Sequence, residues 1–225
     1  MKNLIHTSII LFILFCSISA FSQITRNQDL LNDKSTIGAF DLRSKNLVGS
    51  SYIDDAFLPV RLSTDETIYS MRYDAYQDEM EVEKDGNTYY LKKDYNYTAT
   101  FINSDKIYKV YNYEEKDILK TGFFVVLYSG NIVSLLSKEK IKFYEEVEAK
   151  TGYEKYQPPK LKRESDQLFI GYKNNTAKEF PNKKKDIIKM FSGKSNEIES
   201  YAKKNKLGFK KQEDLIKIFK YYNSL

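Results

Sequence analysis

Residues Thr121–Leu136, with the sequence TGFFVVLYSGNIVSLL, make up a strongly apolar stretch in the middle of the chain. Ser129-Gly130 divides this stretch into two runs of strand-forming residues, which predicts a hairpin with a two-residue turn. In that register Val125 lies opposite Ser134. Because side chains alternate along a strand, the register leaves apolar residues on both faces of the hairpin. Both faces therefore need cover from the rest of the chain.

The segment before this hairpin predicts further antiparallel strands. Glu79–Lys93 contains Asp85-Gly86, a favoured two-residue turn, and the resulting register places Val82 opposite Tyr89. A slip by one residue would mix the two faces, so this register is strongly specified. The face opposite Val82 carries a row of carboxylates, which predicts a solvated surface that pairs with Lys92. These carboxylates are Glu79, Glu81 and Glu83.

Beyond Pro181 the apolar spacing changes to that of helices. Asn182 is placed to cap a helix over residues 183–191, Ser195 to cap a second, and a third covers residues 212–222. Such short helices need tertiary packing, and their apolar stripe suits one face of the central hairpin. The stripe consists of Ile198, Tyr201, Leu215 and Phe219. We therefore predict an α+β fold: an antiparallel β-sheet, sandwich-like or partly rolled, followed by three short C-terminal α-helices.

The N-terminus predicts export. Lys2 precedes an apolar run that ends at the small-x-small triplet Ala20-Phe21-Ser22, which is typical of a cleaved signal peptide. The predicted organisation is therefore a signal peptide over residues 1–22, a loose arm over 23–45, an antiparallel β domain over 46–175, and a basic helical segment over 176–225 that packs on the sheet. The expected location is the periplasm, the periphery of the outer membrane or the cell exterior.

Cleavage after Ser22 would leave 203 of the 225 residues and would remove the single Cys and the single His. A mature chain without Cys or His has no disulfide, no Cys nucleophile, no His general base and no zinc site built on either residue. No motif for a cofactor or for nucleic acid is present either. We expect no cofactor, no metal and no nucleic-acid partner.

Charge is distributed unevenly along the chain. Residues 23–172 carry 21 Lys and Arg against 25 Asp and Glu, whereas residues 173–225 carry 14 Lys against 6 acids. A basic segment of this kind is suited to anionic lipid, lipopolysaccharide or an acidic protein. The alternative is that the lysines are solvated helix faces without a partner. The candidate contacts are Lys183, Lys184, Lys185, Lys203, Lys204, Lys210 and Lys211.

Three functions remain open. The first is a non-enzymatic binding or accessory protein at a membrane surface or with a protein partner. The second is a glycan hydrolase that uses a pair of carboxylates, for which Asp78 and the three glutamates of the Glu79–Lys93 hairpin are candidates. The third is a purely structural accessory protein.

Three segments resemble a group of uncharacterised secreted proteins from Gram-negative envelopes of the Bacteroidota type. They are GSSYIDDAF at residues 49–57, RYDAYQDEME at 72–81, and the C-terminal pair EDLIK and YYNSL at 213–217 and 221–225. The resemblance implies a periplasmic or surface-associated protein. No catalytic residue is associated with these motifs.

Overall fold

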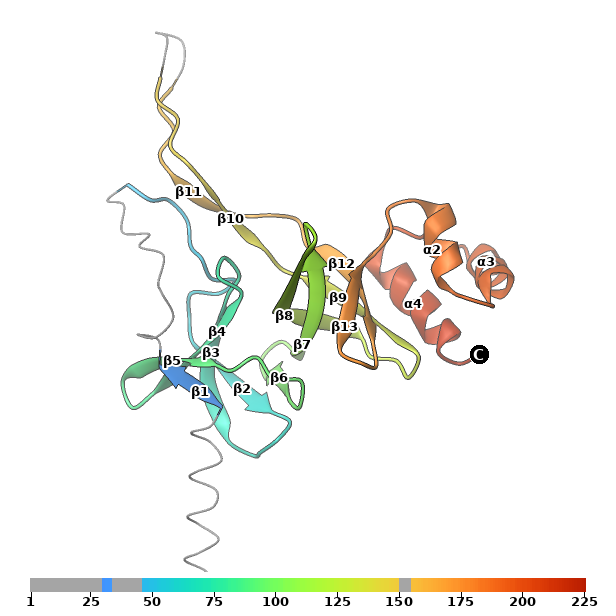
Figure 1. Ribbon diagram of the computed structural model, residues 1–225, viewed down its shortest axis with the longest axis horizontal. Coiled ribbons are helices and arrows are strands. Elements are labelled where there is room, and N and C mark those ends of the chain that lie inside the picture. Colours follow the sequence, from blue (N-terminus) through green and yellow to red (C-terminus); the bar gives the residue numbers. More distant parts are fainter. Residues whose placement is uncertain (1–29, 34–45, 150–154) are drawn as a thin grey trace, which may run out of the picture.

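The computed structural model describes residues 30–33, 46–149 and 155–225, and it confirms the α+β class (Figure 1). The described strands all precede Pro181, and three helices follow. The predicted signal peptide and most of the predicted arm lie outside the described residues. Within that arm, Leu31–Asp33 form a short strand at the edge of the sheet.

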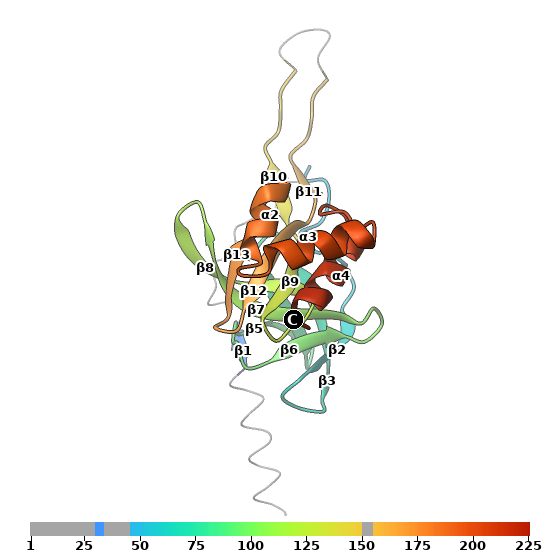
Figure 2. The same cartoon turned by 90° about the vertical axis from the view of Figure 1, so that its right-hand side faces the viewer.

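Eleven strands belong to one large sheet, and two more form a separate hairpin that projects from the body (Figures 1 and 2). The strands of the large sheet are β1 (Leu31–Asp33), β2 (Leu58–Leu62), β3 (Ile68–Asp74), β4 (Glu79–Lys84), β5 (Asn87–Leu91), β6 (Thr98–Phe101), β7 (Lys106–Glu115), β8 (Ile118–Tyr128), β9 (Val133–Lys138), β12 (Gln167–Tyr172) and β13 (Thr176–Glu179). The separate hairpin consists of β10 (Ile141–Tyr144) and β11 (Lys160–Arg163), and the helices are α2 (Lys184–Met190), α3 (Ser195–Lys204) and α4 (Gln212–Tyr222).

The large sheet is rolled, and its second half closes on itself. Its strand order is β1-β5-β4-β3-β2-β6-β7-β13-β12-β9-β8, and β7 also pairs with β8. Strands β7, β13, β12, β9 and β8 therefore form a closed ring, in which only the β13–β7 pair is parallel. Each ring strand contributes to one aromatic core inside the ring. Its members include Tyr111, Tyr113, Phe124, Leu136, Phe169 and Ala177.

The central hairpin, now β8 and β9, belongs to three cores at once. Phe123 on β8 points into the core that β2–β7 enclose, whereas Phe124 points into the ring. Leu135 on β9 packs in a third core, under the helices. The expectation that both faces of this hairpin are apolar and covered is confirmed, and the cover comes from three different parts of the fold.

The helices form a layer over one side of the ring, as Figure 2 shows in front of β9, β12 and β13. Helix α4 contacts β8 and β9, and Leu215, Phe219 and Ile198 are fully buried in the third core. Tyr201 is only half-buried, and its ring stacks on Tyr221 with 3.9 Å between the ring centroids. Three of the four residues of the predicted stripe thus lie in the core next to the hairpin.

The two predicted hairpin registers have different outcomes. Val82 pairs with Tyr89 across the Asp85-Gly86 turn, as predicted. The predicted pairing of Val125 with Ser134 is wrong, since Val125 lies opposite Ser137. A bulge next to Tyr128 and a four-residue connection over residues 129–132 replace the two-residue turn.

The 129–132 connection owes its shape to a residue near the C-terminus. The Asn223 Oδ1 atom accepts hydrogen bonds from the backbone N–H groups of Ile132 (2.7 Å) and Val133 (3.3 Å), and its Nδ2 donates to the Val133 carbonyl (3.0 Å). Gly130 lies so close to this amide that an added Cβ atom would overlap it. A residue 90 positions away therefore supplies hydrogen-bond partners for the connection of this hairpin.

We expect Asn223→Ala to lower the free energy of unfolding by about 1–3 kcal/mol, because the backbone N–H and carbonyl groups of the buried Val133 lose their hydrogen bonds to its side chain. Urea denaturation measures this loss. Asn205→Ala is the matched control, because Asn205 is exposed and its side chain donates only to its own helix, at the Tyr201 carbonyl. Equal destabilisation by the two variants would show that Asn223 does not hold the connection.

The predicted helix caps are wrong, although the third helix has the predicted bounds. Helices α2 and α3 begin after Lys183 and Lys194, and neither residue makes a side-chain cap. The Ser195 hydroxyl instead donates to the Ile188 carbonyl (3.0 Å), at the end of α2. Ser195 therefore joins two helices. The segment predicted to be helical, 176–225, also begins with a strand, β13.

Candidate functional site

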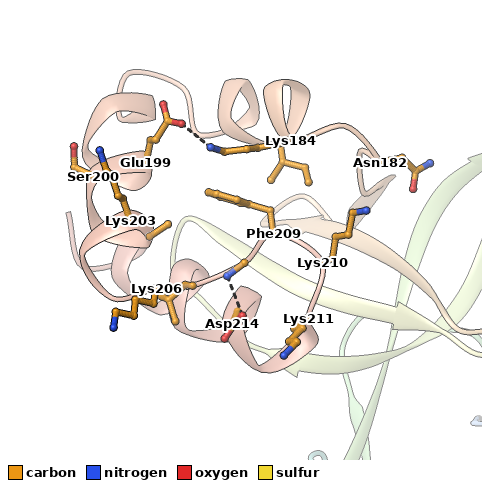
Figure 3. Close-up of a pocket in the computed structure, with 14 residues that line it drawn as sticks. Asn182, Lys184, Glu199, Ser200, Lys203, Lys206, Phe209, Lys210, Lys211 and Asp214 are labelled. Carbon is orange, nitrogen blue, oxygen red and sulfur yellow. Dashed lines mark hydrogen bonds and ion pairs between the residues drawn. The ribbon is translucent and has the colours of Figure 1, made fainter.

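A groove of about 970 Å³ lies between α2, α3 and the segment that connects α3 to α4 (Figure 3). We call it the helical groove. Its apolar part consists of Ile187, Ala202, Leu207 and Phe209. Phe209 is half-buried, and Figure 3 shows its ring beside Lys184. The Lys184 Nζ atom lies 5.7 Å from the centre of that ring.

Lysines dominate the rim of the helical groove. Five lysines line it against two acids, and both acids already have partners. Glu199 pairs with Lys184 (2.8 Å), and the Asp214 carboxylate accepts a hydrogen bond from the Gly208 N–H (2.9 Å). No acid in the described part of the chain forms an ion pair with the other four lysines. These are Lys203, Lys206, Lys210 and Lys211.

The structure divides the seven lysines that the sequence marked as candidates. Four of them line the helical groove: Lys184, Lys203, Lys210 and Lys211. The other three, Lys183, Lys185 and Lys204, are exposed but do not line it. Sequence reasoning missed Lys206, which lines the groove three residues after Lys203. Lys206 lies beyond the end of α3, so helical spacing in the sequence does not indicate that it lines the groove.

Lys206 has a left-handed backbone conformation, with φ 54°. It ends α3 in a Schellman motif, in which the Lys206 N–H donates to the Lys203 carbonyl and the Leu207 N–H donates to the Ala202 carbonyl. Glycine is the usual residue at this position, because a side chain costs about 1 kcal/mol there. The chain thus carries a lysine where glycine is favoured, as it also does at Lys116, with φ 53°.

The row of carboxylates on the Glu79–Lys93 hairpin is not the solvated face that the sequence predicted. Glu81 is fully buried and pairs with Arg72 (2.8 Å), and Glu79 pairs with Lys93 (2.7 Å). Burial raises the pKa of the Glu79 carboxyl, and the Lys93 ammonium opposes that shift. Only Glu83 is exposed, as expected.

The reason for this difference is the segment at residues 51–57, which folds over β3 and β4. The rings of Tyr52 and Phe57 lie on the Arg72 guanidinium, with 3.7 and 4.3 Å from its central carbon to the ring centres. The Tyr52 hydroxyl donates to Glu81 (3.2 Å), and the Ser51 hydroxyl donates to Asp74 (3.0 Å). Two of the segments that carry the resemblance, residues 49–57 and 72–81, are thus packed against each other.

A second, more polar cavity of about 580 Å³ lies at the end of the strand ring. We call it the ring-end cavity. Lys138 is buried there and pairs with Asp78 (2.6 Å), and its ammonium also donates to the Phe123 carbonyl (2.8 Å). Burial lowers the pKa of the Lys138 ammonium, and the Asp78 charge opposes that shift. Asp78 further accepts a hydrogen bond from the Tyr73 hydroxyl (2.6 Å).

Five carboxylates line the ring-end cavity, and Asp78 and Glu139 among them are held in ion pairs. Glu139 is buried and is held by Lys106 (3.0 Å) and Arg163 (2.8 Å), and it also accepts a hydrogen bond from the Tyr108 hydroxyl. Each of these two carboxylates therefore forms an ion pair with a cation and accepts a hydrogen bond from a tyrosine hydroxyl. For Asp78 and Glu139 this arrangement is typical of a structural ion-pair network, because a glycosidase needs one carboxyl group free to protonate the substrate.

Comparison of the chain with protein-family models, with curated proteins and with solved structures gives no match. Across residues 30–33, 46–149 and 155–225, no three His, Cys, Asp or Glu side chains are grouped as metal ligands. No helix in these ranges is long and apolar enough to cross a membrane.

Proposed function

We propose that the protein is an exported, non-enzymatic binding protein, and that its helical groove binds anionic groups at a membrane surface. The observation that carries the proposal is the set of four lysines without acidic partners around a groove with an apolar floor. Repulsion among nearby cations disfavours such a cluster, and a bound anion would relieve it. The apolar floor favours an anion that also has an apolar part.

The strained Lys206 supports the same proposal. A glycine at this position would fit the backbone better, so the lysine side chain needs another reason to be there. The floor residue Phe209 is half-buried and would gain contacts from a ligand. Both features lie on the groove and not on the outer helix faces that carry Lys183, Lys185 and Lys204.

Sedimentation with vesicles of phosphatidylglycerol and phosphatidylcholine tests the proposal. We expect binding to the mixed vesicles and not to pure phosphatidylcholine, with a strong decrease as salt is added. The variant Lys203→Ser/Lys206→Gly/Lys210→Ser is expected to lose about a hundredfold in affinity, at about 1 kcal/mol per lysine. Its free energy of unfolding should not fall, since glycine suits position 206.

The matched control is Lys183→Ser/Lys185→Ser/Lys204→Ser, which removes the same charge from lysines outside the groove. We expect it to retain most of the binding. Equal losses in the two variants would mean that net charge alone attracts the protein to the vesicles. That result, or salt-insensitive binding, would refute the groove as the site.

A further inference from the structure

The β10–β11 hairpin continues outward beyond its two strands, and this continuation carries side chains that have no role in the core. We call residues 145–149 and 155–157 the hairpin extension. Its two sides are joined by a reciprocal pair of backbone hydrogen bonds between Val147 and Gln157, each 2.9 Å long. Every residue of the extension is exposed, including Val147 and Tyr156, at 52% and 47%. An isolated two-stranded hairpin is only marginally stable in water, so a partner would stabilise the extension.

One face of the extension combines two carboxylates with an aromatic ring. Val147 lies opposite Gln157, and side chains alternate along each strand. Glu146, Glu148 and Tyr156 therefore share the other face. The Tyr156 hydroxyl donates a hydrogen bond to Glu146 (3.1 Å), which agrees with this placement. Desolvation, the bond to Glu146 and the charges of Glu146 and Glu148 raise the pKa of the Tyr156 hydroxyl, so both carboxylates lie near it.

The carboxylates of the extension have no cationic partner. Across residues 30–33, 46–149 and 155–225, the glutamates Glu145, Glu146 and Glu148 form no ion pair. The extension carries these three acids against one cation, Lys155, so its net charge is −2. Two copies of the extension therefore repel each other, and the extension does not fit against itself. The surface that complements it is a basic one.

The helical groove is a surface of this kind. Five lysines and two acids line it, which gives a net charge of +3, and four of these lysines have no acidic partner. Its floor includes the half-buried ring of Phe209. The Tyr156 ring can pack on this floor while Glu146 and Glu148 form charge-assisted hydrogen bonds with the lysines of the rim. The extension and the groove therefore match both in charge and in apolar surface.

The extension does not reach the groove of its own molecule. In Figures 1 and 2 the β10–β11 hairpin points away from the layer that α2, α3 and α4 form. We propose that the hairpin extension of one molecule binds in the helical groove of a second copy. Such a contact joins different surfaces of the two copies, so it links molecules head to tail into rings or open chains. This inference rests on the proposed function for its site, because the extension occupies the groove that also binds anionic groups at a membrane.

Sedimentation velocity at increasing protein concentration tests the inference. The end of a single hairpin buries less surface than a standard interface, so we expect reversible association with a Kd of about 0.1 mM at low salt. Raising the salt to about 1 M should weaken it by about tenfold or more, since opposite charges hold the contact. Glu146→Lys/Glu148→Lys and Lys203→Glu/Lys210→Glu should each cause a loss of about tenfold or more, because each places like charges opposite one another.

An equimolar mixture of these two variants is the decisive measurement. The extension of each variant is complementary in charge to the groove of the other. We therefore expect the mixture to recover about tenfold or more in affinity relative to either variant alone. A single chain with all four substitutions should associate with itself for the same reason. A variant that had lost its fold would not recover in this way.

Two control variants make the same changes of charge elsewhere on the surface. Glu66→Lys/Glu83→Lys alters two exposed acids outside the extension, and Lys185→Glu/Lys204→Glu alters two exposed lysines that do not line the groove. Both controls should associate like the unchanged protein. If a control loses as much affinity as its test variant, net charge governs the association, and the inference is overturned.

The outcomes separate the inference from the proposed function. A protein that stays monomeric at about 1 mM, or two variants that do not complement each other, would overturn the inference. Groove-dependent binding to phosphatidylglycerol vesicles would then leave the proposed function in place. Complementation without groove-dependent binding to vesicles would support the inference and overturn the proposed function. If neither complementation nor groove-dependent vesicle binding occurs, both fail.

Discussion

A chain that stops after Pro181 is expected to lose its cooperative fold and to aggregate. Such a chain keeps every strand but lacks the helices, whose buried residues cover Val133, Leu135 and Ile170 on the sheet. Leaving one such side chain exposed costs about 1.5–3 kcal/mol. The sum for the three approaches the whole stability of a typical domain, about 5–15 kcal/mol. The truncation also removes Asn223, which holds the 129–132 connection.

Circular dichroism, size-exclusion chromatography and urea denaturation measure this effect. A chain that stops after Asn223 is the control, because it loses only the exposed Ser224 and Leu225 and should fold normally. A chain that stops after Tyr172 loses β13 as well, which opens the ring, so its fold should be damaged at least as much. A soluble chain ending at Pro181 with a sharp urea transition would refute the prediction.

Lys138→Met should lower the free energy of unfolding by about 3–5 kcal/mol, the usual cost of breaking a buried ion pair by removing one partner. Methionine keeps much of the volume, so the loss reports the charge of Asp78 that is left without its cation. The Lys138→Met/Asp78→Asn double variant should recover part of the loss, because it leaves no unpaired charge. Urea denaturation of the four proteins in the cycle measures the coupling between the two residues.

Two further variants provide a comparison for this prediction, one with a large expected loss of stability and one with a small loss. Gly122→Ala should also be strongly destabilising, because its added Cβ atom would lie 2.7 Å from the Lys138 Nζ and would overlap the Asp78 carboxylate. Lys120→Met breaks the exposed pair with Glu115 and should cost at most about 1 kcal/mol. If Lys138→Met lowers the free energy of unfolding no more than Lys120→Met does, the buried ion pair stabilises the fold no more than the exposed one.

Features set by neighbours in the sequence could be predicted, and features set by distant contacts could not. The Glu79–Lys93 hairpin has the predicted register because its Asp85-Gly86 turn acts locally. The central hairpin has a bulge and a four-residue connection instead of the predicted turn, and this connection is hydrogen-bonded to Asn223, which lies 90 residues away. The solvated face predicted around Glu81 failed for the same reason, since Tyr52 and Arg72 cover it.

The candidate site was predictable in composition but not in shape. The excess of lysine after residue 173 marks the segment that carries the helical groove, and four of the seven candidate lysines line that groove. No periodicity indicates that Phe209 lines that groove, because Phe209 lies outside the helices. The ring-end cavity could not be predicted either, because it is lined by Asp78, Lys138 and Gln167, which come from separate strands and turns.

The parallel pairing of β13 with β7 sets an order of events in folding. It joins Asn112 to Thr176 and Tyr113 to Ala177, so the ring stays open until more than sixty intervening residues have been made. Closing such a loop is slow compared with forming the hairpins on either side of it. Phe124 and Phe169 remain accessible to other chains until β13 arrives. We therefore expect this protein to depend on a holding chaperone during the interval before β13 closes the ring.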